Sequence, residues 1–320
     1  MSRSREQGAR STTHRCIVLL ALCSVPGVFL GACQANARRA ETGPGGFDGN
    51  RAFGYLQHQV QFGFRIPGTP AHEQEGDWLE NELRARADTV IVQEIRHVTR
   101  RGDTLRLRNV LARFRPAAAE RVLYLAHWDT RPTADQSQNL AQQRLPVPGA
   151  NDGASGVAVL LGVADALKAK PPTIGVDLLF VDGEDYGNFA DTNDVLIGSR
   201  WFAAHQPAGY PPLFAVLFDM VGDKDLQIYV EGNSQAVAPE VVDRVWRTAN
   251  GLGYGRVFVP QVRHTLIDDH VSLQHANIHA IDVVDFDYPS WHTTEDTIDK
   301  VSAASLQIVG DVAVAVVRNP

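Results

Sequence analysis

The chain has 320 residues, of which 44% are hydrophobic and 21% are charged, and its formal net charge is −7. This composition excludes a disordered or collagen-like chain, and the length allows one large domain with a sizeable core. The negative charge argues against nucleic acid or an anionic membrane surface as the main partner.

Residues 1–32 have the pattern of an export leader. Four arginines precede an apolar run from Cys16 to Leu30, which Pro26 interrupts. The run is too short and too broken for a membrane span of about 20 residues. It ends in Leu-Gly-Ala followed by Cys33, a sequence typical of a bacterial lipoprotein cleavage site. We therefore expect a lipoprotein-type signal peptide over 1–32, with an ordinary signal peptide or an uncleaved anchor as alternatives.

This leader predicts an exported protein whose contact with the membrane is a lipid anchor at Cys33, facing the periplasm or the cell exterior. All three cysteines lie at positions 16, 23 and 33. The remainder of the chain has no thiol for a disulfide or a metal ligand, so any metal must bind histidines and carboxylates. Residues 33–50 are polar and Gly-rich and are expected to form a flexible tether before a catalytic domain over 51–320.

The order of apolar segments after residue 50 predicts an α/β fold. Helices are expected at 51–62 and 70–86, followed by a hairpin of strands at 89–98 and 104–114. Four apolar runs, expected to be buried strands, follow at 122–126, 176–181, 213–218 and 278–284. Helical stretches lie near 153–168, 196–205, 238–252 and 302–317. This alternation predicts a single-domain three-layer sandwich, a mixed and mostly parallel sheet flanked by helices, with the hairpin at one edge.

Residue types that bind metals follow each of these apolar runs. They are His127 and Asp129 after the first run, Glu184 and Asp185 after the second, Asp219 after the third, His292 beyond the fourth, and Asp152 in a Gly-rich turn. The carboxyl ends of parallel strands meet at one edge of a sheet, so we expect these side chains to share a crevice. Each residue alone could be a structural strand-end group, a helix cap or part of a solvated loop.

Carboxylates crowded in one crevice repel one another, and a divalent cation relieves that repulsion. Histidine and carboxylate ligands without a thiol suit Zn²⁺ in a catalytic site. Asp129 lies two residues past His127, where it is expected to accept the other imidazole N–H of a metal-bound histidine.

These segments resemble a known family. His-Trp-Asp at 127–129, Asn-Asp-Gly-Ala-Ser-Gly at 151–156, Gly-Glu-Asp at 183–185, Asp219 and the Trp-His-Thr at 291–293 are similar to the zinc aminopeptidase and glutaminyl cyclase superfamily, of the peptidase M28 type. Residues 59–70, 126–132 and 268–270 are most similar to its bacterial glutaminyl cyclases of animal type. Thr-Glu-Asp-Thr at 294–297 is common in the peptidases of the superfamily.

The resemblance implies a zinc exopeptidase-like fold and a role for each matching residue. It implies zinc on Asp152, Asp185 and His292, and proton transfer by Glu184. It further implies a carboxylate network containing Asp219 and Asp268, and a substrate pocket with Trp291 as one wall. In the two-zinc aminopeptidases the positions of His127 and Asp219 bind a second ion, so one zinc or two stays open.

The implied reaction is that of a glutaminyl-peptide cyclotransferase, an acyltransferase that converts the N-terminal glutamine of a peptide to pyroglutamate and releases ammonia. The alternative is a dinuclear zinc aminopeptidase, and both enzymes act on peptides with free N-termini. A non-enzymatic binding lipoprotein is a third interpretation, which the intact Glu184 disfavours. Aromatic residues near the motifs fit a cage around a glutamine side chain or an apolar subsite, whereas Phe286 is expected to pack in the core.

Overall fold

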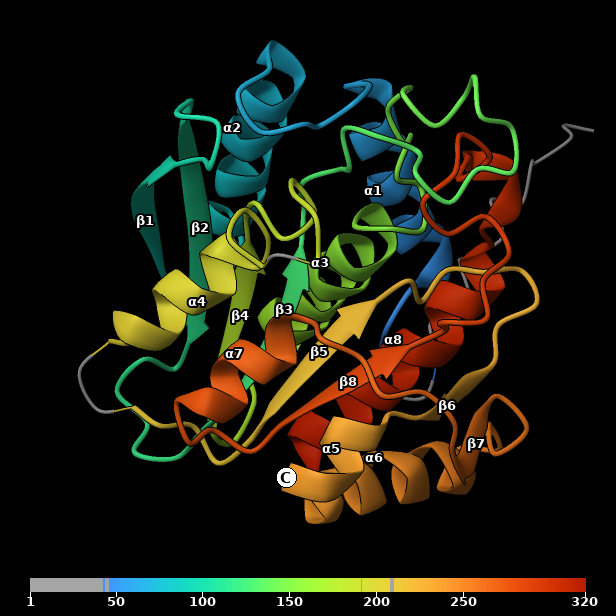
Figure 1. Ribbon diagram of the computed structural model, residues 1–320. Helices are drawn as coiled ribbons and strands as arrows, with labels where there is room; N and C mark the ends of the chain where they lie inside the picture. Colours follow the sequence, from blue (N-terminus) through green and yellow to red (C-terminus); the bar gives the residue numbers. More distant parts are fainter. Residues whose placement is uncertain (1–42, 44–45, 191, 208–209) are drawn as a thin grey trace, which may run out of the picture. The chain divides into compact units, whose positions relative to one another are not determined.

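The computed structural model describes residue 43 and residues 46–190, 192–207 and 210–320 (Figure 1). The expected signal peptide, Cys33 and most of the expected tether therefore lie outside the described residues. Among the helices that the structure describes, none combines the length and the apolar character needed to cross a membrane.

A six-stranded mixed sheet forms the centre of the fold, in the order β1-β2-β4-β3-β5-β8. The strands are β1 (Thr89–Val98), β2 (Thr104–Phe114), β3 (Arg121–His127), β4 (Gly175–Val181), β5 (Ala215–Asp219) and β8 (Ala280–Val284). β3 pairs in parallel with β4 and β5, and β5 pairs in parallel with β8. β1 and β2 form an antiparallel hairpin, and β2 runs antiparallel to β4. The predicted sheet, parallel except for an antiparallel hairpin at one edge, is confirmed.

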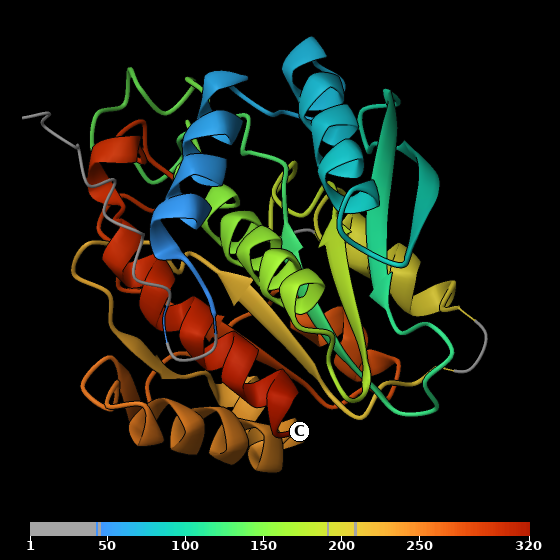
Figure 2. The same ribbon diagram turned by 180° about the vertical axis from the view of Figure 1, so that it is seen from behind.

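Helices cover both faces of this sheet. On one face, best seen in Figure 2, lie α1 (Gly49–Gln61), α3 (Ala154–Ala169) and α8 (Ala303–Arg318), with α2 (Pro70–Arg84) beside the hairpin. On the other face lie α4 (Ile197–Ala204) and α7 (Asp269–His275). Alternate residues of β3 face opposite layers: Tyr124 packs with the α3 side, whereas Leu123 and Leu125 pack with the α4 and α7 side. The three-layer sandwich is thereby confirmed.

Several short elements were not predicted. β6 (Ile228–Val230) and β7 (Phe258–Val262) form a separate two-stranded parallel sheet, connected through α5 (Gly232–Val237) and through α6 (Pro239–Gly251), the helix expected near 238–252. The two strands, α5, α7 and the 3₁₀ turn η1 (Ile298–Lys300) are too short for a hydrophobic period to be visible in the sequence.

Packing begins upstream of residue 51, where the sequence places the start of the domain. Asp48 caps α1 by accepting the Arg51 N–H at 3.1 Å, and the Phe47 ring is fully buried. An added Cβ would lie 2.4 Å from this ring at Gly162 of α3 and 2.3 Å from it at Gly310 of α8. These two glycines make room for Phe47, which joins both helices to the start of α1.

Candidate active site

The carboxyl ends of the parallel strands bring the candidate residues together, as the sequence predicts. His127 is the last residue of β3 and Asp219 the last of β5. Asp185 lies in the turn after β4, Asp152 in the turn before α3, and His292 in the loop after β8. All five residues are at most 8% exposed although they are ionisable, so each needs partners inside the protein.

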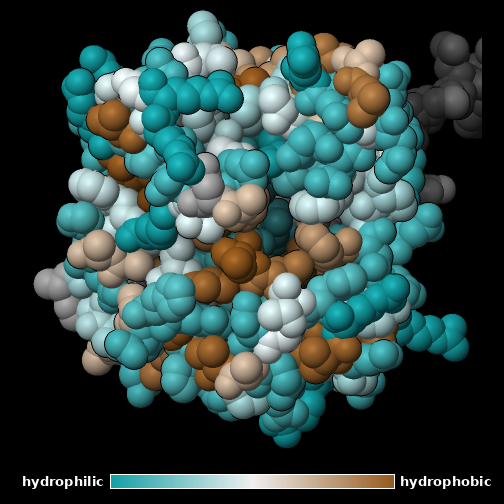
Figure 3. All heavy atoms as spheres, in the orientation of Figure 1, coloured by the Kyte–Doolittle hydropathy of each residue, from teal (hydrophilic) through white to brown (hydrophobic). Residues whose placement is uncertain are grey.

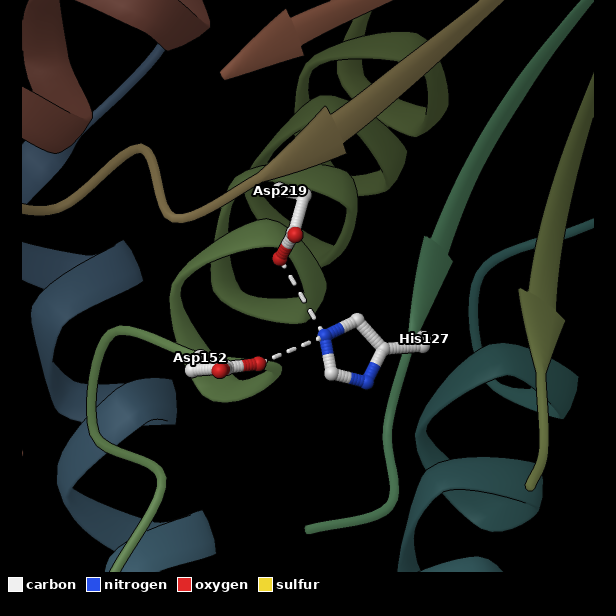
Figure 4. A group of neighbouring side chains, drawn as sticks. All are labelled: His127, Asp152 and Asp219. Carbon is white, nitrogen blue, oxygen red and sulfur yellow. Dashed lines mark hydrogen bonds and ion pairs between the residues drawn. The ribbon is translucent and has the colours of Figure 1, made fainter. Parts of the chain in front are cut away.

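A first group of ligand atoms consists of His127, Asp152 and Asp219 (Figure 4). Nε2 of His127 lies 3.1 Å from Oδ1 of Asp152 and 3.1 Å from Oδ1 of Asp219. The imidazole points between the two carboxylates, which come from the turn before α3 and from the end of β5.

A second group consists of Asp152, Asp185 and His292. Nε2 of His292 lies 3.4 Å from Oδ1 of Asp185 and 3.6 Å from Oδ2 of Asp152. Asp152 therefore gives one oxygen to each group. In a tetrahedral zinc site with bonds of about 2.0–2.1 Å, neighbouring ligand atoms are about 3.3 Å apart. Both groups approach that spacing, and their donor types fit zinc.

Two further aspartates fix the backbone of the loops that carry these ligands. Asp129 accepts the N–H of Glu184 at 3.1 Å and that of Asp185 at 3.2 Å. Asp296 accepts the N–H of Asn151 at 2.8 Å and that of Asp152 at 3.1 Å. Because Asp129 is turned toward two backbone donors, its Oδ1 lies 3.7 Å from Nδ1 of His127, beyond a normal hydrogen bond. Asp129 supports the backbone of this loop, and its expected contact with the imidazole of a metal-bound His127 stays a prediction.

Glu184 stands beside both groups without belonging to either. Its side chain is 5% exposed and lines the cavity described below. Burial raises the pKa of Glu184 well above its usual value, and the carboxylates of Asp185 and Asp268 raise it further against the opposing effect of His127. Burial and the neighbouring Asp219 also raise the pKa of Asp268. A carboxyl with a raised pKa can both take up and release a proton near neutral pH, as general acid–base catalysis requires.

A cavity of about 340 Å³ opens onto these residues. Figure 3 shows it as a recess near the middle of this face, with hydrophobic residues along its lower rim. Its polar end is formed by Asp152, Glu184 and His292, and its apolar wall includes Trp291 and Phe286, whose rings are 4.7 Å apart. Phe286 was expected to pack in the core, and it does so only in part: it is half-buried against the cluster of Met220, Val284 and Tyr288 and also lines the cavity.

Two other aromatic residues near the motifs, Trp128 and Tyr288, lie outside this cavity. Trp128 is fully buried and stacks on His72 at 4.3 Å, and Tyr288 is buried with its hydroxyl donating to Asp296 at 2.8 Å. The polar segment 131–148 borders the cavity as predicted, through Arg131, Asp135 and Gln136.

The model of peptidase family M28 matches residues 109–317, about two thirds of the chain, which include β3, β4, β5, β8 and both ligand groups. The chain is a member of peptidase family M28. This confirms the family resemblance of its motifs.

Solved structures of similar chains come from both branches of the superfamily. One is a Zn-dependent exopeptidase from Parabacteroides distasonis, 33% identical, covering 86% of this chain and 99% of that chain, with a TM-score of 0.82. A glutaminyl cyclase from Tannerella forsythia is 37% identical, with the same two coverages and a TM-score of 0.82. An aminopeptidase of Bacillus subtilis is 29% identical over 188 residues. The chain spans about two fifths of the length of the curated relatives it matches.

Within this M28 fold, the sequence pattern missed three residues that hold the ligands. Asp296 was visible only as part of a peptidase-like segment, and Arg131 and Asp135 only as members of a polar loop. The i, i+4 spacing of Arg131 and Asp135 was the available indication of an ion pair, but it does not indicate which third residue the pair contacts.

Proposed function

We propose that this M28 protein is a zinc-dependent glutaminyl-peptide cyclotransferase. The observation that carries the proposal is the position of Glu184, a buried carboxyl with a raised pKa between the metal-ligand groups and a small cavity walled by Trp291 and Phe286. The similarity to glutaminyl cyclases over 98–99% of their length supports the same reaction.

The cavity suits the N-terminal residue of a peptide. Its apolar wall can flank the methylene groups of a glutamine side chain, and its polar end can receive the γ-carboxamide. A zinc ion held by Asp152, Asp185 and His292 would supply Lewis-acid polarisation of the γ-carbonyl. Because the α-amine and the γ-carbonyl belong to one residue, holding that residue in a folded conformation supplies much of the rate.

Proton transfer is the task of Glu184. The α-amino nitrogen forms a bond to the carbonyl carbon of the γ-carboxamide, the bond from that carbon to the amide nitrogen breaks, and ammonia leaves. Glu184 takes a proton from the attacking amine and delivers one to the departing nitrogen. No water is consumed in this sequence, so the apolar wall at Trp291, by displacing water from the substrate, also favours cyclisation over hydrolysis.

A dinuclear aminopeptidase is the second candidate, and one observation favours it. Asp152 directs one oxygen to each ligand group, so the two groups could share it as a bridge between two ions. In that enzyme Glu184 would act as the base for an attacking water. Both ligand groups are complete in side-chain type, so the choice rests on the substrate.

We further propose that the chain is an exported lipoprotein, on the pattern of residues 1–33. Replacing Cys33 with Ser is expected to move the protein from the membrane fraction to the soluble fraction. A Cys33→Ser protein that still sediments with membranes would contradict the lipid anchor.

Parallel assays on the purified protein distinguish the two reactions. Glutaminyl peptides are expected to release ammonia, and the same peptides with an acetylated α-amine are expected to be inert because their nucleophile is blocked. Leucyl and alanyl amides are also expected to be inert, since they have no γ-carboxamide. Efficient hydrolysis of leucyl amides, with glutaminyl peptides unchanged, would establish the aminopeptidase instead.

A further inference from the structure

One arginine contacts both a member of the second ligand group and a carboxylate beside that group. Arg131 is 3% exposed, and its guanidinium donates to Oδ1 of Asp185. The same guanidinium donates through Nε at 3.0 Å and Nη2 at 2.8 Å to the two oxygens of Asp135. This two-point contact fixes the plane of the Asp135 carboxylate, because a guanidinium and a carboxylate form a rigid pair.

Asp135 in turn lies beside His292. Its Oδ1 is 3.4 Å from Nδ1 of His292, on the side of the imidazole opposite the ligand oxygens. Nδ1 is buried and has no well-formed hydrogen bond within the part of the chain that the structure describes. The next residue, Gln136, donates its backbone N–H to the His292 carbonyl at 3.2 Å.

The backbone of His292 needs such support. Its φ is 51°, in the left-handed region of backbone conformation. This region is unfavourable for a residue with a Cβ, so the conformation persists only where neighbouring contacts stabilise it. The loop after β8 must keep this conformation for Nε2 to face Asp152 and Asp185. The contacts from Asp135 and Gln136 are well placed to do so.

We propose that Arg131 and Asp135 form a positioning pair for the metal site of Asp152, Asp185 and His292. Asp135 accepts the Nδ1 proton of His292 and so directs Nε2 to the metal, while Arg131 holds Asp135 and Asp185 at once. At the first ligand group the corresponding carboxylate lies farther from its histidine: Oδ1 of Asp129 is 3.7 Å from Nδ1 of His127, and Asp129 accepts from two backbone N–H groups rather than from an arginine. The site containing His292 is therefore the tighter of the two.

The direction of the effect follows from charge and geometry. A carboxylate on the far nitrogen of a metal-bound imidazole fixes the tautomer and makes the imidazole a stronger donor. The positive charge of Arg131 is offset by Asp135, so the pair adds orientation without adding net positive charge next to the ion. The inference rests on the zinc site of the proposed function and holds for either reaction.

The test is the zinc dissociation constant of the purified full chain, measured by competition with a coloured chelator in the absence of substrate. Asp135→Asn is expected to weaken the tighter site by about 10–100-fold, the usual cost of losing such a partner. The Asp135 side chain is 41% exposed, so this change leaves the core intact. Unfolding of the zinc-free protein provides the check on the fold.

Asp287→Asn is the matched control. Asp287 is 34% exposed and accepts from Arg263 and His264, each at 3.0 Å, so it is also an aspartate between an arginine and a histidine. It lies outside both ligand groups. Its replacement is expected to leave the zinc affinity unchanged.

A variant without Arg131 tests whether Asp135 affects the zinc affinity only when Arg131 holds it. In Arg131→Met, or in Arg131→Lys if the first variant does not fold, Asp135 is no longer held by two points. Asp135→Asn should then cost less than about threefold in zinc affinity. Unchanged zinc affinity in Asp135→Asn, or an equal loss of affinity with and without Arg131, would contradict the proposed role of the pair. If Asp135→Asn weakens zinc binding but the wild type hydrolyses leucyl amides, the cyclase proposal is refuted and the role of the pair stands.

Discussion

Replacing Glu184 with Gln tests the proton-transfer role most selectively. Gln has nearly the same size and shape, and the Glu184 backbone is held independently by Asp129 at 3.1 Å. Glu184 belongs to neither ligand group, so the zinc content is expected to stay at the wild-type value. Loss of general acid–base catalysis lowers turnover by about 10²–10⁴-fold, which corresponds to about 3–5 kcal/mol in the activation barrier.

The same substitution should not destabilise the fold. Burial and the carboxylates of Asp185 and Asp268 raise the pKa of Glu184, which means that the folded protein resists a negative charge at this position. A neutral amide removes that repulsion, so the melting temperature of the zinc-free variant is expected to equal or exceed that of the wild type.

The assay combines turnover of a glutaminyl peptide, zinc content and thermal unfolding, with Glu73→Gln on the exposed surface of α2 as a control. A Glu184→Gln enzyme within about tenfold of wild-type turnover would show that another group moves the proton. A variant that is inactive only because it has lost its zinc would also refute the reasoning.

Three further predictions concern the ligands, the core and the pH dependence. His292→Ala should lose tightly bound zinc and nearly all activity, whereas His127→Ala should cost less; equal losses on assay of both variants would indicate a two-zinc enzyme. Gly156→Ala should lower stability to urea by about 1–3 kcal/mol, because the added Cβ would lie 2.1 Å from the Phe218 carbonyl oxygen; an unchanged midpoint would contradict this packing. Burial raises the pKa of Asp285 to about 7. The protonated carboxyl therefore contributes its full stabilisation below about pH 4, and this contribution is lost as the pH rises through 7. A difference in unfolding free energy between wild type and Asp285→Asn that stays constant over this pH range would refute the raised pKa.

The sequence predicts the sheet and the edge at which the site lies for a clear physical reason. β3 and β4 are buried at every position because helices cover both faces, so they appear in the sequence as continuous apolar runs. A polar residue such as Asp219 directly after such a run marks the end of the strand. The ends of the apolar runs therefore suffice to place the candidate ligands in one crevice.

The same pattern does not predict which partner each side chain chooses. Leu213 was expected in a buried strand but is 50% exposed, because β5 begins two residues later. Phe286 was assigned to the core, although it also lines the cavity. The support of His292 by Asp135 joins two irregular loops far apart in the sequence, and no periodicity records such a contact.

The most direct test of the proposed cyclase is to run the reaction in water enriched in the heavy isotope of oxygen and to measure the masses of the products by mass spectrometry. Cyclisation joins the α-nitrogen of the substrate to the carbonyl carbon of its own γ-carboxamide, so the pyroglutamyl peptide should contain no oxygen from the solvent while ammonia is released. A peptidase must place one solvent oxygen in the carboxylate that it creates. Pyroglutamyl product without label is the result expected here, and a labelled free amino acid together with a shortened peptide would contradict the account.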